Sequence, residues 1–124
     1  MSLLEELKSL GIDVDEGLDR VVGDNALYEM MIGMFADLAD DNSVSVEDFS
    51  GEDLSMLTKR VHMLKDITGN LAITPLFGRY TKVLGLLRTN QAPEAREEFA
   101  EILPVQEKIM DCIKRHRGDS GIAE

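Results

Sequence analysis

Helix-start signals followed by apolar residues at helical spacing are the feature that most constrains how this chain can fold. Asp24 is a favourable N-cap residue, and after it apolar side chains recur every three or four positions to about residue 40. Thr74 and Pro75 open another helix, because proline at the first helical position loses no internal hydrogen bond. Pro93 opens the last helix in the same way. The chain is therefore predicted to fold as helices packed against helices.

Weaker signals complete the set of expected helices. Asp13 or Asp15 can cap a short helix near the N-terminus, and Ser50 can cap a helix that follows a polar loop over residues 40–50. Pro104 lies inside the last helix and is expected to bend or split it. The expected helices cover residues 3–10, a short segment that ends at residue 23, and residues 25–40, 51–72, 74–90 and 92–117.

Apolar side chains at helical spacing mark the expected buried faces. The seven methionines are interpreted mostly as core fillers, because methionine adapts to irregular gaps. The short helix before residue 23 is expected to bury Leu18, Val21 and Val22. The helix over residues 25–40 is expected to bury Leu27, Met30, Met31, Met34, Phe35 and Leu38.

The composition agrees with an all-α fold in one domain. Aromatic residues make up only 5% of the 124 residues, and few strand-forming residues occur in alternating runs. A chain of this length has no room for a second core of comparable size. We expect three or four substantial antiparallel helices with smaller helices at the N-terminus, and a frayed tail over residues 114–124.

The charge and the single cysteine restrict partners and compartment. The formal net charge of −11 opposes binding to nucleic acid and to anionic membrane surfaces. Cys112 has no partner for an internal disulfide, which favours a reducing compartment. The N-terminus lacks the apolar core of a signal peptide, and no apolar run is long enough for a membrane span. We expect a cytoplasmic monomer, because the fold needs no second copy to bury its core.

His62 is the residue with the clearest chemical potential. On a helical wheel it lies opposite the expected core stripe, so its imidazole should face solvent in the middle of a helix. Lys65 follows one turn later, and its ammonium is suited to holding a phosphoryl oxygen. Gly69 lies almost directly above His62, where a helical glycine suggests close approach of another group. A neutral imidazole can accept a phosphoryl group on its unprotonated nitrogen.

These residues resemble the signature of histidine phosphotransfer (HPt) domains, His-x-Leu-Lys-Gly followed by a second glycine. The matching segments are His-Met-Leu-Lys at residues 62–65 and Gly-Asn-Leu at residues 69–71. Residues 11–18, followed by Gly-Asp at 23–24, also look like the first segment of the family. The similarity covers roughly residues 11–113, which makes this range the expected core of a single domain over residues 1–124.

The resemblance implies a four-helix bundle with accessory helices that acts as a phosphocarrier in a phosphorelay. On this interpretation His62 is phosphorylated, Lys65 stabilises the phosphoryl group and Gly69 leaves clearance for a receiver domain. The partners would be the receiver domain of a response regulator and a hybrid sensor kinase. The protein would have no catalytic machinery or cofactor of its own, since the Mg²⁺ would belong to the receiver domain.

The chain departs from the family pattern in two places. Asp66 stands where the family usually has glycine, and its carboxylate can hydrogen-bond to the imidazole and repel an acidic receiver pocket. Leu84 stands where many members place a glutamine that binds the second ring nitrogen, whereas Arg88 matches a basic position of some members. Thr58, Lys59, Asp66 and Arg88 are therefore the expected partner-docking or tuning residues.

Other functions remain as alternatives. The departures also suit a phosphotransfer-silent bundle that serves as a receiver- or kinase-binding module, and a helical enzyme subunit is a third possibility. A metal site finds no support in the sequence, because the two histidines are far apart and no Cys/His cluster exists. His116 and Cys112 are accordingly interpreted as structural residues.

Overall fold

The computed structural model describes residues 2–120, with the side chains of residues 2–117, and this part of the chain contains helices and no strand. The predicted all-α fold is confirmed. Six α-helices and one 3₁₀ helix follow one another within the described residues. They are α1 (Leu3–Ser9), α2 (Val14–Arg20), α3 (Asn25–Asp41), η1 (Val46–Ser50), α4 (Ser55–Asn70), α5 (Thr74–Arg88) and α6 (Ala92–Ser120).

Local capping explains where most of these helices begin. The Asp13 side chain accepts a hydrogen bond from the backbone N–H of Glu16, and the Asp24 side chain accepts one from Leu27. The sequence predicted the Asp24 cap and the proline in the first turn of α5, and of the two caps it offered for α2, Asp13 and Asp15, the structure uses Asp13. Local side-chain chemistry therefore sets these helix starts.

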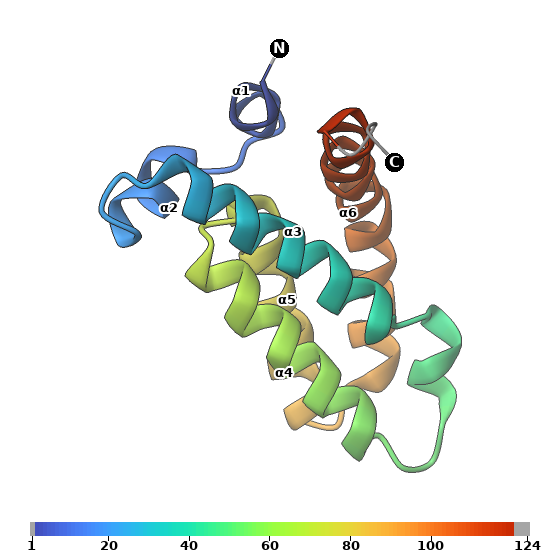
Figure 1. The fold of residues 1–124 in the computed structure, drawn as a ribbon. Coiled ribbons are helices and arrows are strands. Elements are labelled where there is room, and N and C mark those ends of the chain that lie inside the picture. Colours follow the sequence, from blue (N-terminus) through green and yellow to red (C-terminus); the bar gives the residue numbers. More distant parts are fainter. Residues whose placement is uncertain (1, 121–124) are drawn as a thin grey trace.

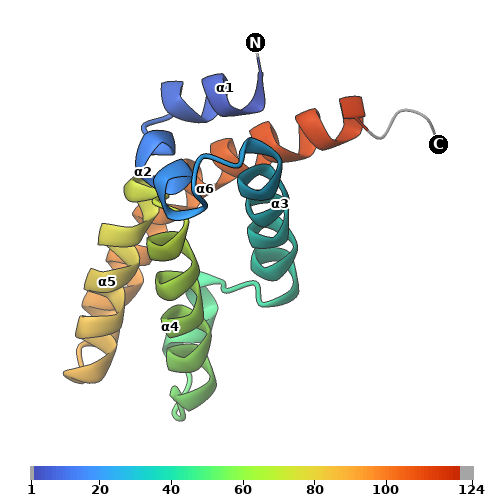
Figure 2. The same cartoon turned by 60° about the vertical axis from the view of Figure 1, so that its left-hand side comes forward.

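The most extensive helix packing in the fold is between α4, α5 and α6. Helix α5 packs against α4 on one side and α6 on the other, and α3 makes smaller contacts with both α4 and α6 (Figure 1). In Figure 2 the C-terminal half of α6 extends past α4 and α5 and lies alongside α1. Thus α1 and α2 cover one end of the α3–α6 assembly, and α4 and α5 present an adjacent pair of helices to solvent.

Two buried tyrosines connect helices across the core. The Tyr28 hydroxyl on α3 donates a 2.7 Å hydrogen bond to the backbone carbonyl of Leu71, at the end of α4. Burial raises the pKa of Tyr28 to about 12, so the hydroxyl stays protonated as a donor. The Tyr80 hydroxyl on α5 donates to the side-chain carbonyl of Gln106 on α6. Gly17 is required beside Tyr28, because an added Cβ would lie 2.4 Å from the tyrosine ring.

The start of α4 differs from the prediction. Ser50 was expected to cap a helix from residue 51, but α4 begins at Ser55, and the expected loop contains η1. The reason is tertiary packing: Phe49 in η1 is buried against Phe99 of α6, with the ring centroids 5.3 Å apart. The chain must then turn away before α4 can start, and the Asp53 side chain accepts from the N–H of Ser55 at this turn.

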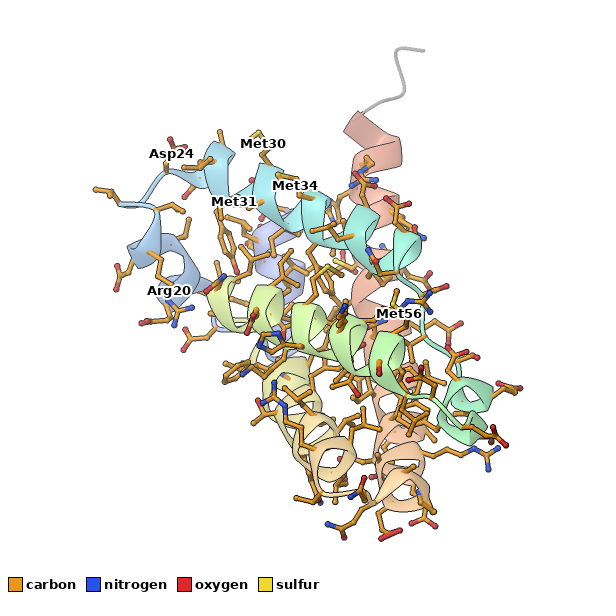
Figure 3. The ribbon with its side chains drawn as sticks, turned by 90° about the horizontal axis from the view of Figure 1, so that it is seen from below. Arg20, Asp24, Met30, Met31, Met34 and Met56 are labelled. Atoms are coloured by element: carbon orange, nitrogen blue, oxygen red, sulfur yellow. The ribbon has the colours of Figure 1, made fainter. Side chains whose placement is uncertain are left out.

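The buried face of α3 also differs from the prediction. Met30 and Met34, expected in the core, are 58% and 52% exposed, and Met56 on α4 is 60% exposed (Figure 3). The interpretation of the methionines as mostly core fillers is therefore wrong for these three. Val22 was expected to be buried and is 95% exposed in the turn after α2. The residues of α3 that are buried are Tyr28, Ile32, Phe35, Ala36 and Ala39.

Helix α6 continues through two positions that were expected to weaken it. Pro104 lies inside α6 and does not split it, although the helix changes direction along its length (Figure 2). Residues 114–120 of the expected frayed tail are helical, and their basic side chains make ion pairs, including Lys114 to Asp40 at 2.9 Å and Arg117 to Asp37 at 3.0 Å. Residues 121–124 of that tail lie outside the described residues.

Within residues 2–120, no helix combines the length and apolar character needed to cross a lipid bilayer.

Candidate functional site

Helix α4 presents its imidazole to solvent. His62 lies near the middle of α4 with 47% of its side chain exposed, while Leu57, Val61 and Leu64 are buried on the opposite side. Thr68 completes the buried stripe, and its hydroxyl donates to the Leu64 carbonyl at 2.8 Å. The structure therefore places His62 where a second protein can reach its ring nitrogens.

Asp66 is the charged group nearest to the imidazole. Its Oδ2 lies 3.5 Å from Nε2 of His62, one turn back along α4. Its other oxygen, Oδ1, lies 3.8 Å from Nζ of Lys65. The carboxylate thus lies between the imidazole and the ammonium and contacts both. The structure brings these predicted site residues together, and it places Asp66 between the two residues expected to handle a phosphoryl group.

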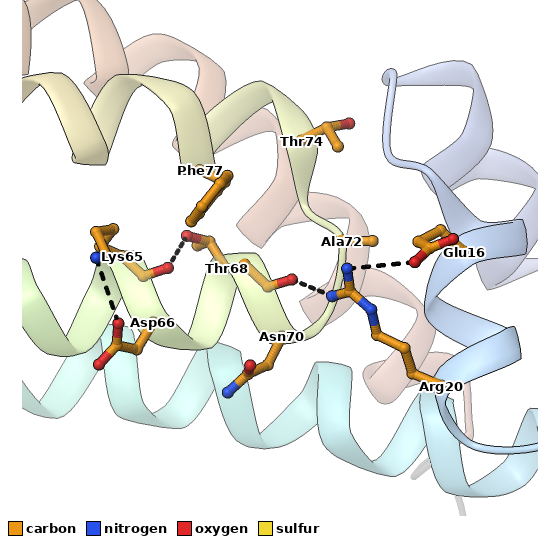
Figure 4. A pocket seen from close by; sticks show the side chains of 10 residues that line it. Glu16, Arg20, Lys65, Asp66, Thr68, Asn70, Ala72, Thr74 and Phe77 are labelled. Carbon is orange, nitrogen blue, oxygen red and sulfur yellow. Dashed lines mark hydrogen bonds and ion pairs between the residues drawn. The ribbon is translucent and has the colours of Figure 1, made fainter.

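The space beside Gly69 is filled by another residue of the protein. A Cβ added there would lie 2.7 Å from Cε1 of Phe77, so the ring of α5 uses the space that the glycine leaves. The Gly69 carbonyl accepts a hydrogen bond from the Arg20 guanidinium, which also pairs with Glu16 at 3.3 Å (Figure 4). Close packing of α5 explains this glycine without any partner, and its role in receiver clearance stays a prediction.

A hollow of about 530 Å³ opens beside Lys65 and Asp66. Arg20 reaches into it from α2, and the Phe77 ring, 39% exposed, lines its α5 side (Figure 4). Neither residue was singled out from the sequence. Arg20 lies 49 residues before the carbonyl that it contacts, and no local pattern predicts such a pair. The hollow lies between Lys65 and Asp66 on α4 and Arg20 on α2, and one aromatic and several charged side chains line it.

The register of α4 against α5 locates the remaining predicted residues. Gly69 packs on Phe77, so in this antiparallel pair Leu84 lies at the level of His62 and Arg88 at the level of Thr58. Leu84 is only 2% exposed and faces the core, and the next residue of α5 is a glycine. Neither Leu84 nor Gly85 has a side chain that can hydrogen-bond to the imidazole.

The other docking candidates lie toward the N-terminal end of α4. The Thr58 hydroxyl donates to the Leu54 carbonyl at 2.8 Å, so it is engaged within its own helix. Lys59 is exposed and lines a separate shallow hollow with Thr58 and Asn90. Arg88 is exposed near the C-terminal end of α5. Within the described residues, no hydrogen bond or ion pair joins Thr58, Lys59 or Arg88 to His62.

The fold also assembles a group of side chains that the sequence does not reveal. Glu6 of α1 approaches Cys112 and His116 of α6, and Nε2 of His116 lies 2.9 Å from Oε1 of Glu6. The Arg115 guanidinium is hydrogen-bonded to the other Glu6 oxygen and holds the pKa of that carboxyl at about 2. Cys112 and His116 are one turn apart on α6, and the fold adds Glu6 to them from α1, so the expected absence of a metal site stays a prediction.

No protein-family model, curated protein or solved structure matches this chain significantly.

Proposed function

We propose that this protein is a cytoplasmic histidine-containing phosphotransfer protein, which carries a phosphoryl group on His62 to and from the aspartates of receiver domains. In this proposal α3 to α6 form the four-helix bundle of an HPt domain, and α1 and α2 are its accessory helices. The observation that carries the proposal is the placement of an exposed, mid-helix imidazole on the basic surface of an otherwise acidic protein.

Charge is distributed very unevenly along this chain. Residues 55–88, which include α4 and α5, contain six basic residues and one acidic residue. The rest of the chain contains seven basic and 23 acidic residues. A receiver domain presents an acidic pocket around its aspartate, so it would be attracted to the α4–α5 surface and repelled by the remainder.

Some of these basic residues are engaged within the protein. Arg79 and Lys82 pair with Glu98 of α6, at 3.4 and 3.1 Å. Lys59 and Lys65 lie one turn before and one turn after His62 on α4, where side chains share a face of the helix. Arg60, two residues before His62, points to the other side of α4.

The chemistry requires little from this protein beyond position. The lone pair of the unprotonated ring nitrogen of His62 attacks phosphorus in the aspartyl phosphate of the receiver. The bond between phosphorus and the aspartate oxygen breaks, the carboxylate leaves as an anion, and the imidazole keeps its one N–H. The receiver supplies the Mg²⁺ that balances charge on the phosphoryl oxygens. The Lys65 ammonium, one turn along α4, supplies a positive charge near the ring nitrogen that accepts the phosphoryl group.

Phosphotransfer from receiver domains tests the proposal. The full-length protein is incubated with each receiver domain encoded in the same genome, phosphorylated on its aspartate, and acid-labile phosphate on this chain is followed. At least one receiver should transfer its phosphoryl group to the wild-type protein, and His62→Gln should abolish the transfer. His116→Gln is the matched control, because it removes the other histidine of the chain and leaves α4 intact.

Three outcomes would overturn the proposal. The first is the absence of transfer from every receiver to a wild-type protein whose helical circular dichroism is intact. The second is equal labelling of the wild type and His62→Gln. Loss of labelling in His116→Gln alone would move the phosphorylated residue to α6 and would also overturn it.

The contact between Asp66 and His62 favours a second candidate function, a bundle that binds a receiver or kinase without accepting phosphate. The carboxylate 3.5 Å from Nε2 repels a phosphoryl group, and Leu84 offers no orienting bond. Asp66→Gly separates the two functions. A rise in transfer from a negligible level to a ready one would favour the silent module, whereas ready transfer in the wild type would exclude it.

A further inference from the structure

The side chains of Glu6, Cys112 and His116 come together where α1 crosses the C-terminal half of α6 (Figure 2). Cys112 and His116 are four residues apart on α6, so they lie on the same face of the helix. Glu6 approaches this face from α1. One carboxylate oxygen, the cysteine sulfur and one imidazole nitrogen all lie within 4.8 Å of one another.

We propose that these three residues form a zinc-binding site. Carboxylate oxygen, thiolate sulfur and imidazole nitrogen are the three donor types that zinc accepts in proteins, and two such donors four residues apart on a helix are a common element of its sites. Magnesium and calcium prefer all-oxygen sites, and this group has only one oxygen donor residue. The site is far from His62 and is independent of the proposed phosphotransfer function.

The distances suit a tetrahedral ion. With zinc bonds of about 2.0–2.1 Å to nitrogen and oxygen, the two donor atoms of a tetrahedral site lie about 3.3 Å apart. The observed separation between Nε2 of His116 and Oε1 of Glu6 is 2.9 Å. A widening of a few tenths of an ångström therefore admits the ion between them. Water would fill the fourth position, since both side chains are 20% exposed.

Cys112 supplies the sulfur ligand of the site. It is the only cysteine of the chain, and its side chain is fully buried. Zinc binds the thiolate, so binding of the ion would release the thiol proton to solvent.

The Arg115 guanidinium beside Glu6 orients the site. It is hydrogen-bonded to Oε2 of Glu6, so Oε1 is left turned toward His116. Outer-sphere hydrogen bonds of this kind fix the orientation of a ligating carboxylate. An ion held here would join α1 to α6 across 106 residues of sequence, and it would stabilise the folded state in proportion to its affinity.

Titration of the metal-free, full-length protein with Zn²⁺ and with Co²⁺ tests the site. One Zn²⁺ should bind per chain, and Co²⁺ should give a thiolate-to-cobalt charge-transfer band in the near ultraviolet. At free zinc about 100-fold above the dissociation constant, the melting temperature should rise by roughly 10 °C. Cys112→Ser, His116→Gln and Glu6→Gln should each weaken binding at least tenfold, a loss at the lower end of that expected for a ligand.

His62→Gln is the matched control, because it removes the other histidine and should bind zinc as the wild type does. Absence of the thiolate band in the wild-type Co²⁺ spectrum would overturn the site, and this result needs no variant to fold. Wild-type affinity in Cys112→Ser or His116→Gln would overturn it as well. So would a tenfold loss in His62→Gln. Since phosphate transfer is not measured, failure here leaves the proposed function of His62 unaffected.

Discussion

If His62 carries a phosphoryl group as proposed, Asp66→Asn is expected to accelerate its transfer to His62 by about 5- to 30-fold. The substitution keeps the size and shape of the side chain and removes the only negative charge of α4 and α5. In the wild type, Oδ2 of Asp66 lies 3.5 Å from Nε2 of His62. A phosphoryl group that approaches this nitrogen must therefore come close to a carboxylate of the same sign.

The magnitude follows from Coulomb's law at the observed geometry. Two unit charges about 5 Å apart interact by roughly 0.8 kcal/mol in water, and a phosphoryl group carries about two such charges. Salt screening lowers this energy, and the nearby protein raises it. Because the two side chains are 47% and 52% exposed, we expect a net repulsion of about 1–2 kcal/mol. Each 1.4 kcal/mol changes a rate about tenfold, which gives the stated range.

Lys65 is a second reason to expect faster transfer in Asp66→Asn. Its Nζ lies 3.8 Å from Oδ1 of Asp66, so the carboxylate competes with a phosphoryl group for the ammonium. Asp66→Asn releases Lys65 from this competition. Lys65→Gln should therefore slow transfer more in the Asp66→Asn background than in the wild type, and a double-mutant cycle measures the difference.

Single-turnover transfer from a phosphorylated receiver domain is the appropriate assay, since it separates the chemical step from product release. Asp66→Glu is the matched control because it keeps the charge, and its rate should stay close to the wild-type rate. The gain in Asp66→Asn should shrink between about 50 and 500 mM salt, because the Debye length falls over this range. An unchanged or slower rate in a helical Asp66→Asn protein would refute the electrostatic argument.

Further substitutions test the structure itself. Gly78→Ala should raise the free energy of unfolding by about 1 kcal/mol, because no atom lies within 4 Å of an added Cβ, whereas Gly69→Ala should gain nothing because its methyl group meets the phenyl ring of α5. Val22→Asn should stabilise the protein by about 1 kcal/mol in urea denaturation, since φ at this exposed position is 55° and asparagine tolerates this conformation better than a β-branched residue. The hydrogen bond from Arg115 lowers the pKa of Glu6 from 4.5 to about 2, so its stabilisation is present above pH 4.5 and is lost as the pH falls through 2. In metal-free protein, the melting temperature of Glu6→Gln should accordingly lie below that of the wild type at pH 5, and the difference should shrink as the pH falls toward 2.

Features set by neighbouring residues were predictable from the sequence. The caps at Asp13 and Asp24 and the proline start of α5 involve partners within one turn, and the structure contains all three. The exposure of His62 was predictable for a similar reason, since α4 has one clearly apolar side.

Helix α3 shows where periodicity fails. Its apolar residues extend around most of its circumference, so several stripes fit the helical period equally well. The stripe that is buried contains Tyr28, whose hydroxyl needs the Leu71 carbonyl, and Ala36, whose small side chain permits close packing. Met30 and Met34 lie outside the buried stripe and are exposed. The choice depends on the shape of the partner helices, which the pattern of α3 does not contain.

Contacts between residues far apart in the sequence account for the other features that the sequence did not predict. Arg20 contacts Gly69 from 49 residues away, and Glu6 contacts His116 from 110 residues away. The motif around His62 could be found because its members lie within two turns of one helix. The hollow lined by Arg20 and the group of Glu6, Cys112 and His116 could not be found, because each combines residues of helices that meet only in the fold.

The distribution of charge connects the acidic surface with the basic one. If the proposed function holds, a receiver domain meets few acidic residues on α4 and α5, because 23 of the 24 acidic residues lie outside residues 55–88. The net charge of −11 would then oppose docking at His62 less than docking at the rest of the protein. Asp66 is the one acidic residue of this segment, and it lies beside the imidazole. A charge at that position has little effect on where a receiver binds and a direct effect on how fast phosphate is transferred, so association and transfer should respond to different residues of the same helix.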